Sequence, residues 1–400
     1  RCPAKPTTIA PMNDATRNLI QAIHDSPPRA VFAAAGAGSQ ALADLLGVPG
    51  ASRTLLEALI PYTADAFDEF LGGAPEQYVS AETGRRMAGR ALARARHLRE
   101  MEAWPLVGLA CTATIVTDRP KKGEHRAHVA AWTPARLRIY ALRLEKGARD
   151  RAGEEGLVSA LLLDALAEAS GVVARPALPL GPGDSLTAET VDFAPAAERL
   201  HGDDVPFFGI LPDGALTTAP PMALLSGSFN PLHAGHTGLA ATAAALLGAP
   251  VAFELSVVNA DKPRLPSDAV LDRLSQFAGR YAAYAGNAPT FVEKARLYPG
   301  AVFVVGFDTA ARVIQPRYYG GSEAGMLAAL DELRRRGNRF LVAGRLDDDG
   351  LFHELPELAL PAGYETLFEA IPARLFRHDV SSTEIRATLQ AEADAEAARR

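Results

Sequence analysis

Two histidines stand in a glycine-containing segment whose residue types suit phosphate binding. The segment 225–236 reads L-S-G-S-F-N-P-L-H-A-G-H, with His233 and His236 on either side of Gly235. Gly227 allows the backbone to approach a phosphate closely, and the N-terminus of a following helix supplies free N–H donors and a positive dipole. At a spacing of three residues both imidazoles lie on one face of the first helical turn. The pattern therefore predicts that both rings contact the same phosphate group.

A second segment with phosphate-binding character lies near the end of the chain. Residues 380–386 read V-S-S-T-E-I-R. Two serines and a threonine followed by glutamate are typical of a helix N-cap with a capping box. The capped N-terminus, its hydroxyl groups and Arg386 one turn along would also hold pyrophosphate well. We therefore predict phosphate ligands at Ser381, Ser382, Thr383 and Arg386.

Both segments resemble motifs of one family, the HxGH nucleotidyltransferases. Residues 227–236 are similar to G-[GST]-F-[DN]-P-x-H-x-G-H of the nicotinamide or nicotinate mononucleotide adenylyltransferases, and residues 380–386 to their I-S-S-T-x-I-R signature. The resemblance implies a Rossmann-like α/β domain with a parallel sheet that binds ATP, Mg²⁺ and a pyridine mononucleotide. It implies catalytic roles for His233, His236 and Arg386, and phosphate binding by Gly227, Ser228 and Phe229.

Weaker features agree with this family. Lys262, in N-A-D-K-P, follows the predicted second strand, where the family commonly carries a phosphate-facing lysine; a solvated loop lysine is the alternative. Asp308, in V-V-G-F-D-T, resembles the family aspartate that contacts the nucleotide, and could instead cap the next helix. The strand Phe340–Arg345 resembles the one that ends in an arginine near the nucleotide. The K-M-S-K-S loop of the related aminoacyl-tRNA synthetases is absent.

The chemistry implied by this family needs cationic donors more than a base. A mononucleotide phosphate has a second pKa of about 6, so at neutral pH its attacking oxygen is already largely deprotonated. Catalysis then consists of positioning and of stabilising the charge that grows on pyrophosphate. We expect His233 and His236 on the α- and β-phosphates, Arg386 with Ser381 and Ser382 on the β- and γ-phosphates, and Mg²⁺ bridging phosphate oxygens. Neighbouring phosphates would favour the imidazolium form of each histidine. We expect no metal ligands from protein side chains.

Alternating patterns predict the elements that position these residues. Apolar runs typical of strands occur at 222–225, 251–257, 301–306 and 340–343, and helical patterns at 235–247, 268–279 and 322–336. This βαβα alternation predicts a parallel sheet with right-handed crossovers. Upstream, strand-like runs at 29–34, 105–112, 126–132 and 136–144 mix with helical patterns at 81–99 and 156–170, which predicts a separate α/β domain.

Prolines and glycines between the two regions indicate a boundary. The segment 174–220 contains Pro176, Pro179, Pro182, Pro195, Pro206, Pro212 and Pro220. Such composition is typical of a linker. We predict an N-terminal domain over 14–173, a Pro-rich linker over 174–220 and a nucleotidyltransferase domain over 221–396.

The N-terminal region, about 28–172, resembles the CinA C-terminal domain, the nicotinamide-nucleotide amidase. The match runs through V-P-G at 48–50. Aligned from there, the serine nucleophile of the family falls at Ala35 and its lysine at Phe67, and neither side chain can attack an amide. Ser39 is displaced by about one helical turn and is predicted to start a helix. The resemblance therefore implies an amidase-like domain without amidase activity, and such domains often self-associate.

One basic segment of this domain leaves two interpretations open. Residues 119–126 read R-P-K-K-G-E-H-R, where the family has a glycine-rich loop. The segment either binds a phosphate or nucleotide, or forms a solvated basic turn between two strands.

Composition bounds the remaining function classes. The 400 residues carry a formal net charge of −6, which disfavours general nucleic-acid binding, because that requires a basic face. Cys2 and Cys111 are too few for a disulfide framework, which fits an intracellular, cytoplasmic protein. No apolar run reaches the roughly 20 residues of a membrane span. Residues 1–11 lack the apolar region of a secretory signal, and whether they belong to the mature protein stays open.

The leading hypothesis is transfer of an adenylyl group from ATP to nicotinamide or nicotinate mononucleotide, in NAD biosynthesis. The alternatives are a cytidylyl- or adenylyltransferase acting on another phosphorylated small molecule, and a nucleotide sensor without catalysis.

Overall fold

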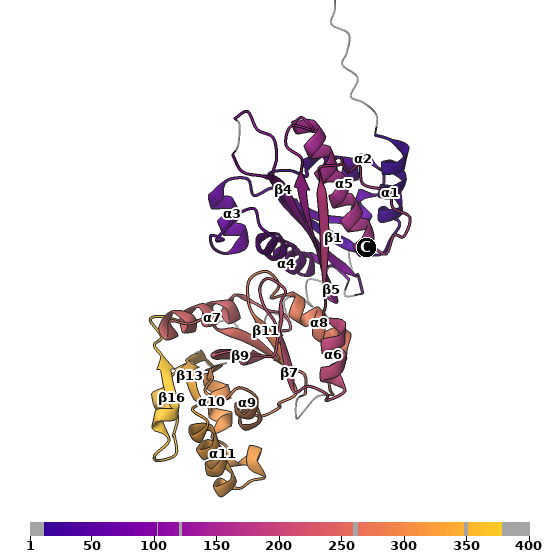
Figure 1. Cartoon of the computed structure of the whole chain (residues 1–400). Coiled ribbons are helices and arrows are strands. Elements are labelled where there is room, and N and C mark those ends of the chain that lie inside the picture. The colour runs from indigo at the N-terminus through magenta and orange to yellow at the C-terminus, as the bar shows by residue number, and fades with distance from the viewer. Residues whose placement is uncertain (1–11, 102, 120–121, 259–262, 348–350, 378–400) are drawn as a thin grey trace, which may run out of the picture. The chain divides into compact units, whose positions relative to one another are not determined.

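The computed structural model describes residues 12–101, 103–119, 122–258, 263–347 and 351–377. The chain forms two compact units, each of which is an α/β fold (Figure 1). The first unit comprises the chain up to Phe193 together with residues 212–215 and 275–280. The second unit comprises residues 194–211, 216–274 and the chain from Tyr281 onward. Lys262, Ser381, Ser382, Thr383 and Arg386 lie outside the described residues.

The first unit is built on a mixed six-stranded sheet in the order β2-β1-β3-β4-β5-β6. Strands β1, β2 and β3 are parallel, and the strands from β3 to β6 are antiparallel neighbours. The strand bounds are Arg29–Ala35 (β1), Leu55–Leu59 (β2), Leu106–Thr114 (β3), His125–Thr133 (β4), Arg136–Leu144 (β5) and Ser185–Asp192 (β6). The helices are Asp14–His24 (α1), Ser39–Gly47 (α2), Ala64–Leu71 (α3), Ala81–Leu98 (α4) and Arg151–Ala169 (α5).

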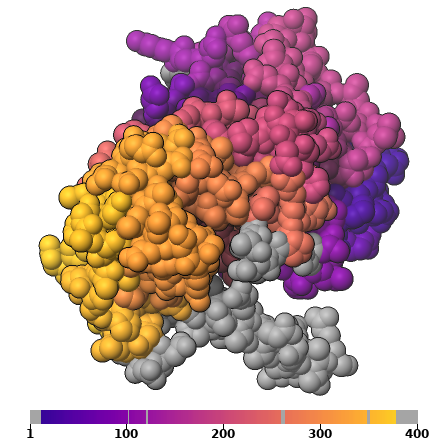
Figure 2. Space-filling model, turned by 90° about the horizontal axis from the view of Figure 1, so that it is seen from below, coloured from indigo at the N-terminus to yellow at the C-terminus, as the bar shows by residue number. Residues whose placement is uncertain are grey.

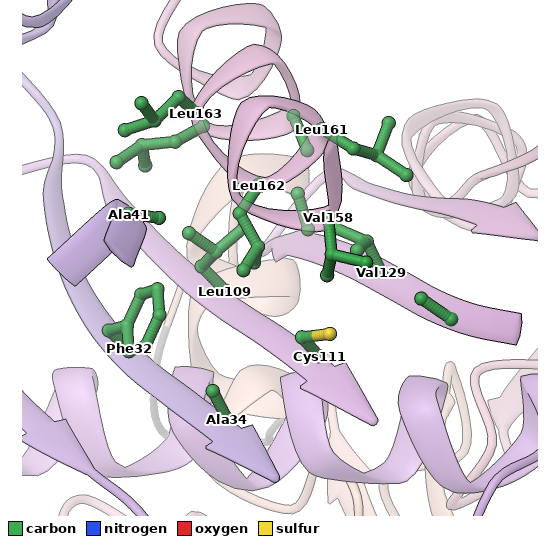
Figure 3. Close-up of a cluster of buried hydrophobic side chains, with 14 of the residues drawn as sticks. Phe32, Ala34, Ala41, Leu109, Cys111, Val129, Val158, Leu161, Leu162 and Leu163 are labelled. Carbon is green, nitrogen blue, oxygen red and sulfur yellow. The ribbon is translucent and has the colours of Figure 1, made fainter. Parts of the chain in front are cut away.

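Helices cover both faces of this sheet. On one face α5 lies over the central strands, and its Leu161 and Leu162 pack into a core with Phe32, Leu109 and Val129 (Figure 3). On the other face α4 lies against β3 at Gly108, where a Cβ atom would lie 2.1 Å from the carbonyl oxygen of Ala88. Only glycine permits this approach, because any side chain would overlap the helix backbone. The sheet is thus buried between two helical layers.

The segment 174–220, predicted as a linker, contains regular elements. It includes β6, which extends the first sheet, and α6 (Ala194–His201), β7 (Phe207–Ile210) and β8 (Leu216–Thr217) of the second unit. Most of its prolines lie between these elements or, like Pro195, in the first turn of a helix, where the missing N–H costs little. The proline pattern therefore marks element boundaries here and does not mark an unstructured connection.

The second unit contains an eight-stranded sheet in the order β16-β13-β12-β9-β10-β11-β7-β8. The strands from β16 to β11 are parallel, and β7 pairs antiparallel with β11 at one side. Counted from β9, the parallel strands run 3-2-1-4-5-6, the order of dinucleotide-binding doubly wound sheets. Their bounds are Ala223–Gly227 (β9), Ala252–Ser256 (β10), Ala283–Gly286 (β11), Val302–Gly306 (β12), Arg339–Ala343 (β13) and Phe368–Ile371 (β16).

Connecting helices complete the second unit. They are Ala234–Leu247 (α7), Ser267–Ser275 (α8), Phe291–Leu297 (α9), Phe307–Val313 (α10) and Glu323–Arg335 (α11), and a short hairpin joins β14 (Arg345–Leu346) to β15 (Phe352–His353). Phe303, Phe340 and Phe368 occupy one row across neighbouring strands, with ring centroids 5.7 and 5.0 Å apart. This aromatic row holds β12, β13 and β16 together. Figure 2 shows the outer surface of this part of the unit in orange and yellow.

Every strand expected from an apolar run lies in one of the two sheets, and the second sheet has the predicted parallel core. Within the described ranges, no helix combines the length and apolar character that crossing a bilayer requires.

We predict that a partly buried ion pair anchors the segment leading into β6. Asp184 accepts hydrogen bonds from Arg149, at 2.6 and 3.0 Å, and from the backbone N–H groups of Glu145 and Gly181. The Arg149 hydrogen bond is the main cause that lowers the pKa of Asp184 to about 2. Because the folded pKa lies below the unfolded value, the stabilisation of about 2 kcal/mol is complete above pH ~4 and disappears as the pH falls toward 2.

Asp184→Asn should therefore lower the free energy of unfolding at pH 7, and the difference from wild type should shrink between pH 4 and pH 2. Chemical denaturation across this pH range measures it. A difference that stays constant down to pH 2 would show that the carboxylate charge contributes nothing.

Candidate functional site

The centre of the second sheet is where the direction of the connections reverses. β9 lies between β10 and β12. The chain passes from β9 to β10 and β11 on one side of β9, and then crosses over to β12 on the other side. In doubly wound sheets, ligands bind beyond the carboxyl ends of the strands at such a switch point. The segments that follow β9 and β12 here contain His233, His236 and Asp308.

The loop after β9 is held by a buried aromatic side chain. Phe229 is 1% exposed, and its ring lies edge-on to Phe253 at 5.3 Å and to His236 at 5.1 Å. Its backbone has a φ of +43°, which is unusual for a bulky residue and is maintained here by the packing of its ring. A Cβ atom on Gly227 would lie 2.9 Å from this ring, so glycine is required there. The side chain of Phe229, which is predicted in the phosphate-binding group, therefore shapes the loop.

The two histidines lie together at the N-terminus of α7. His233 is the N-cap residue, and its Nδ1 accepts a hydrogen bond from the N–H of Gly235 at 3.2 Å. The Nδ1 atom of His236 accepts from the N–H of His233 at 3.3 Å, which completes a capping box. The ring centroids are 3.7 Å apart, with the planes tilted by 33°. The spacing argument thus placed both rings correctly on the first turn.

This capping arrangement determines which nitrogen carries the proton. A ring nitrogen that accepts a hydrogen bond carries no proton, so each neutral ring is protonated at Nε2. The imidazolium form expected from nearby phosphates would carry a proton on both nitrogens and would give up the cap. In a neutral ring, these two hydrogen bonds place the proton on Nε2, at the edge of the ring opposite the helix N–H groups.

A charged pair lies at the neighbouring strand ends. Asp308, in the first turn of α10, forms an ion pair with Arg345 of β14, and both side chains are roughly half exposed. The sequence suggested a nucleotide contact for each of them, and the structure brings the two together. Because exposed pairs contribute at most about 1 kcal/mol, a ligand can compete for either partner.

A histidine flanked by carboxylates stands beside this pair. The ring of His353 stacks on Phe307 at 5.4 Å and forms hydrogen bonds with Asp347 at 2.9 Å and Glu357 at 2.7 Å. The hydrogen bond with Asp347, followed by that with Glu357, raises the pKa of His353 above its usual value. Sequence reasoning did not identify this cluster, because its members come together only when the β14–β15 hairpin forms.

Sequence reasoning also missed a buried ion pair below the strand ends. Glu254 of β10 and Lys294 of α9 are 0% and 3% exposed, and Lys294 Nζ lies 2.6 Å from each carboxylate oxygen. The sequence contained one indication of a buried charge, because Glu254 interrupts the otherwise apolar run 251–257. Its partner could not be found the same way, because lysine is common on short helices.

The first unit has a pocket at the positions that the sequence resemblance aligns with the amidase nucleophile and lysine. A cavity of about 230 Å³ is lined by Ala35, Gly36, Tyr62, Thr63, Ala64, Phe67, Tyr78, Val79, Thr112 and Ala113. Ala35 and Phe67, the positions aligned with the family's serine and lysine, thus lie in one pocket. Phe67 is 4% exposed and packs edge-on to Tyr78 at 5.3 Å.

Three hydroxyl groups around this pocket are engaged within the protein. Thr63 caps α3 through Ala66, Thr112 donates to the carbonyl oxygen of Tyr78, and the hydroxyl of Tyr78 donates to Asp68. The hydrogen bond to Asp68 raises the pKa of Tyr78, which makes this hydroxyl a weaker nucleophile. The lining as described contains no lysine, histidine or cysteine.

Ser39 starts α2, as predicted, and lies outside the pocket lining. Its hydroxyl and the N–H groups of Gly38 and Gln40 all donate to one carboxylate oxygen of Glu155, at 2.9 to 3.1 Å. A carboxylate of the protein itself therefore occupies this helix N-terminus, where an anion would otherwise bind.

The basic segment 119–126 is only partly described. Arg126 donates from Nε and Nη2 to the carbonyl oxygen of Val79, at 3.2 and 2.9 Å. His125 pairs with buried Glu154 at 2.7 Å. These two residues belong to β4 and hold the sheet to its surroundings. The phosphate-binding interpretation would then rest on Arg119 and Lys122, and on Lys121, which lies outside the described residues.

Comparisons with known proteins reach only part of the chain. No protein-family model matches it, and no curated protein does. Among solved structures, competence/damage inducible protein CihA from Agrobacterium tumefaciens matches 41% of this chain and 99% of its own, at 17% identity and a TM-score of 0.31. A CinA superfamily protein from Enterobacter cloacae matches 42% of this chain and 100% of its own, at 14% identity and a TM-score of 0.32. Similarity at this level carries no conclusion about activity.

We predict that the first unit releases no ammonia from nicotinamide mononucleotide, because its pocket lacks an activated nucleophile. A coupled ammonia assay with the purified protein measures this, with an active amidase as positive control. Ammonia above the enzyme-free blank would overturn the assignment.

Proposed function

We propose that the second unit is a nucleotidyltransferase that transfers the adenylyl group of ATP to nicotinamide or nicotinate mononucleotide and releases pyrophosphate. One observation carries the proposal: two imidazoles, 3.7 Å apart, cap the helix that follows the first strand at the switch point of the sheet. The Nε2–H donors and the positive end of the helix dipole together form an anion site suited to a polyphosphate.

The proposed reaction is a direct displacement. An oxygen of the acceptor phosphate attacks the α-phosphorus of ATP, the bond from that phosphorus to the bridging oxygen breaks, and the electron pair leaves with pyrophosphate. No proton transfer is required, because the attacking oxygen is ionised at neutral pH. The enzyme must align the two phosphates and stabilise the charge on the departing oxygens.

Each part of the site has a task in this displacement. The Nε2–H groups of His233 and His236 would donate to phosphate oxygens of ATP, and the predicted Arg386, Ser381 and Ser382 would hold its terminal phosphates. Mg²⁺ would arrive with ATP, bridge phosphate oxygens and neutralise part of their charge. Asp308 and Arg345, which form an ion pair at the β12 side, would contact the nucleoside.

The acceptor is proposed from two family resemblances of the sequence. The adenylyltransferase motif and the amidase-like frame each belong to families that handle nicotinamide nucleotides, which favours a pyridine mononucleotide over other phosphorylated acceptors. The first unit would then serve as a binding or scaffold domain of an intracellular enzyme.

An assay of pyrophosphate release tests the function. We expect release with ATP, Mg²⁺ and nicotinamide or nicotinate mononucleotide, and little with CTP or with other phosphorylated acceptors. Release only with another pair would assign a different transferase, and binding of ATP without turnover would indicate a sensor.

Substitutions of the two histidines separate catalysis from folding. His233→Asn keeps a side-chain acceptor at the N-cap but removes the Nε2–H donor, so kcat should fall by about 100-fold or more while the melting temperature changes little. His236→Ala should lower kcat similarly. His201→Ala, an exposed histidine of the same unit, is the matched control and should retain full activity. Rates like those of wild type in His236→Ala would refute the assignment.

A further inference from the structure

The ion pair of Glu254 and Lys294 lies directly below the strand ends that form the proposed site. Glu254 is the Cα partner of Ser226 in the parallel pair of β10 and β9, and the histidine loop begins after the next residue. A buried ion pair adds little stability compared with well-packed apolar side chains. Its presence in a core of aromatic and aliphatic residues therefore points to a role beyond stability.

The third N–H group of the Lys294 ammonium donates to a residue at the carboxyl end of β10, where the proposed site lies. This ammonium has three donors; it contacts the two oxygens of Glu254 and, at 2.8 Å, the Oγ atom of Ser256. Ser256 is the last residue of β10 and is partly buried. Its own contact with Glu254 Oε2 is 3.5 Å long, beyond the range of a well-formed O–H···O bond. Lys294 therefore holds Ser256 as an acceptor and leaves its hydroxyl proton available to a ligand.

Two further hydroxyls beside the pair have no hydrogen-bond partner within the described chain: those of Ser226 and Tyr298, the latter fully buried. The Tyr298 hydroxyl and Glu254 Oε1 both face the space beside Gly286, where a Cβ atom would lie 3.0 and 3.2 Å from them. Burial, together with the charge of Glu254, raises the pKa of Tyr298 well above its usual value, so its hydroxyl remains a donor. Buried polar groups in finished cores are nearly always bonded. This cluster therefore offers hydrogen-bond donors to a polar group that the described residues do not supply.

We propose that Ser256 binds the phosphate of the acceptor substrate and that the Lys294–Glu254 pair is the device that orients its hydroxyl. The proposal rests on the function proposed above. The histidine loop lies between the two sides of the crevice, and Asp308 and Arg345 occupy the β12 side, which leaves the β10 side to the acceptor. Because Lys294 neutralises Glu254, an anionic phosphate meets no uncompensated carboxylate there.

Ser256→Ala tests the contact. The KM for the mononucleotide should rise about tenfold, equivalent to about 1.4 kcal/mol, the worth of one hydrogen bond to a charged group. The KM for ATP should stay unchanged, and Ser256→Thr, which keeps a hydroxyl, should stay within about threefold of wild type. Ser322→Ala, a serine that caps α11, is the matched control. An unchanged KM for the mononucleotide, or a rise for ATP instead, would overturn the proposal.

A second set of variants tests the orienting role. Lys294→Met alone leaves a buried carboxylate unpaired and is expected to unfold the protein. Lys294→Met combined with Glu254→Leu removes both charges with little change in volume, so it should fold and show the same rise in KM. Adding Ser256→Ala to this double variant should raise KM no further, because the three residues act as one unit. A double variant with the KM of wild type would show that the pair is only structural.

The two proposals can fail separately. If the wild-type protein forms no pyrophosphate with any pair of substrates, the proposed function fails, and calorimetric titration with nicotinamide mononucleotide then tests Ser256 alone. Binding that weakens about tenfold in Ser256→Ala supports the contact. Equal binding by both proteins, or none by wild type, refutes it.

Discussion

The hydrogen bonds between the imidazole Nδ1 atoms and the N–H groups at the start of α7 are the interaction on which the proposed site depends. They satisfy backbone donors that a helix N-terminus otherwise leaves without partners. They also leave both Nε2–H groups as donors, with the rings 3.7 Å apart. Capping and the proposed phosphate contacts would therefore use opposite edges of the same rings. The loop that delivers them depends in turn on the buried ring of Phe229 and on the absence of a side chain at Gly227.

Charge in the second unit is arranged around this site. The ion pair of Asp308 and Arg345 is accessible and can exchange a partner for a ligand, whereas that of Glu254 and Lys294 is buried and cannot. An uncompensated carboxylate below the strand ends would oppose a polyphosphate, since Coulomb interactions are strong at low dielectric. The buried pair removes that opposition and directs a proton donor, Lys294, to the end of β10. Lys294 thus has two effects: it neutralises the buried carboxylate of Glu254, and it orients the hydroxyl of Ser256 at the edge of the sheet.

The pocket of the first unit lies where the resemblance to the amidase family predicted a catalytic centre. It is bounded by Ala35 and Phe67 where the amidase-like frame would have a nucleophile and a lysine. Phe67 packs against Tyr78, so the lysine position now contributes to the core. The N-terminus of α2 is occupied by Glu155 of the same unit. The surroundings of the pocket are therefore stabilised by apolar packing and internal hydrogen bonds.

The sequence by itself determined the local features of this protein. Hydrophobic periodicity predicted the strands of both sheets that come from strong apolar runs, and the spacing of His233 and His236 predicted adjacent rings, because both follow from the geometry of single elements. The tertiary structure alone decided which distant residues meet. Crossovers and long-range pairing bring Glu254 together with Lys294 and assemble the cluster around His353. They also order the proline-rich segment through β6 and Asp184. The protonation of the histidines belongs to the same class: a motif supplies the rings, but only the hydrogen bonds of the folded helix start decide which nitrogen is left to donate.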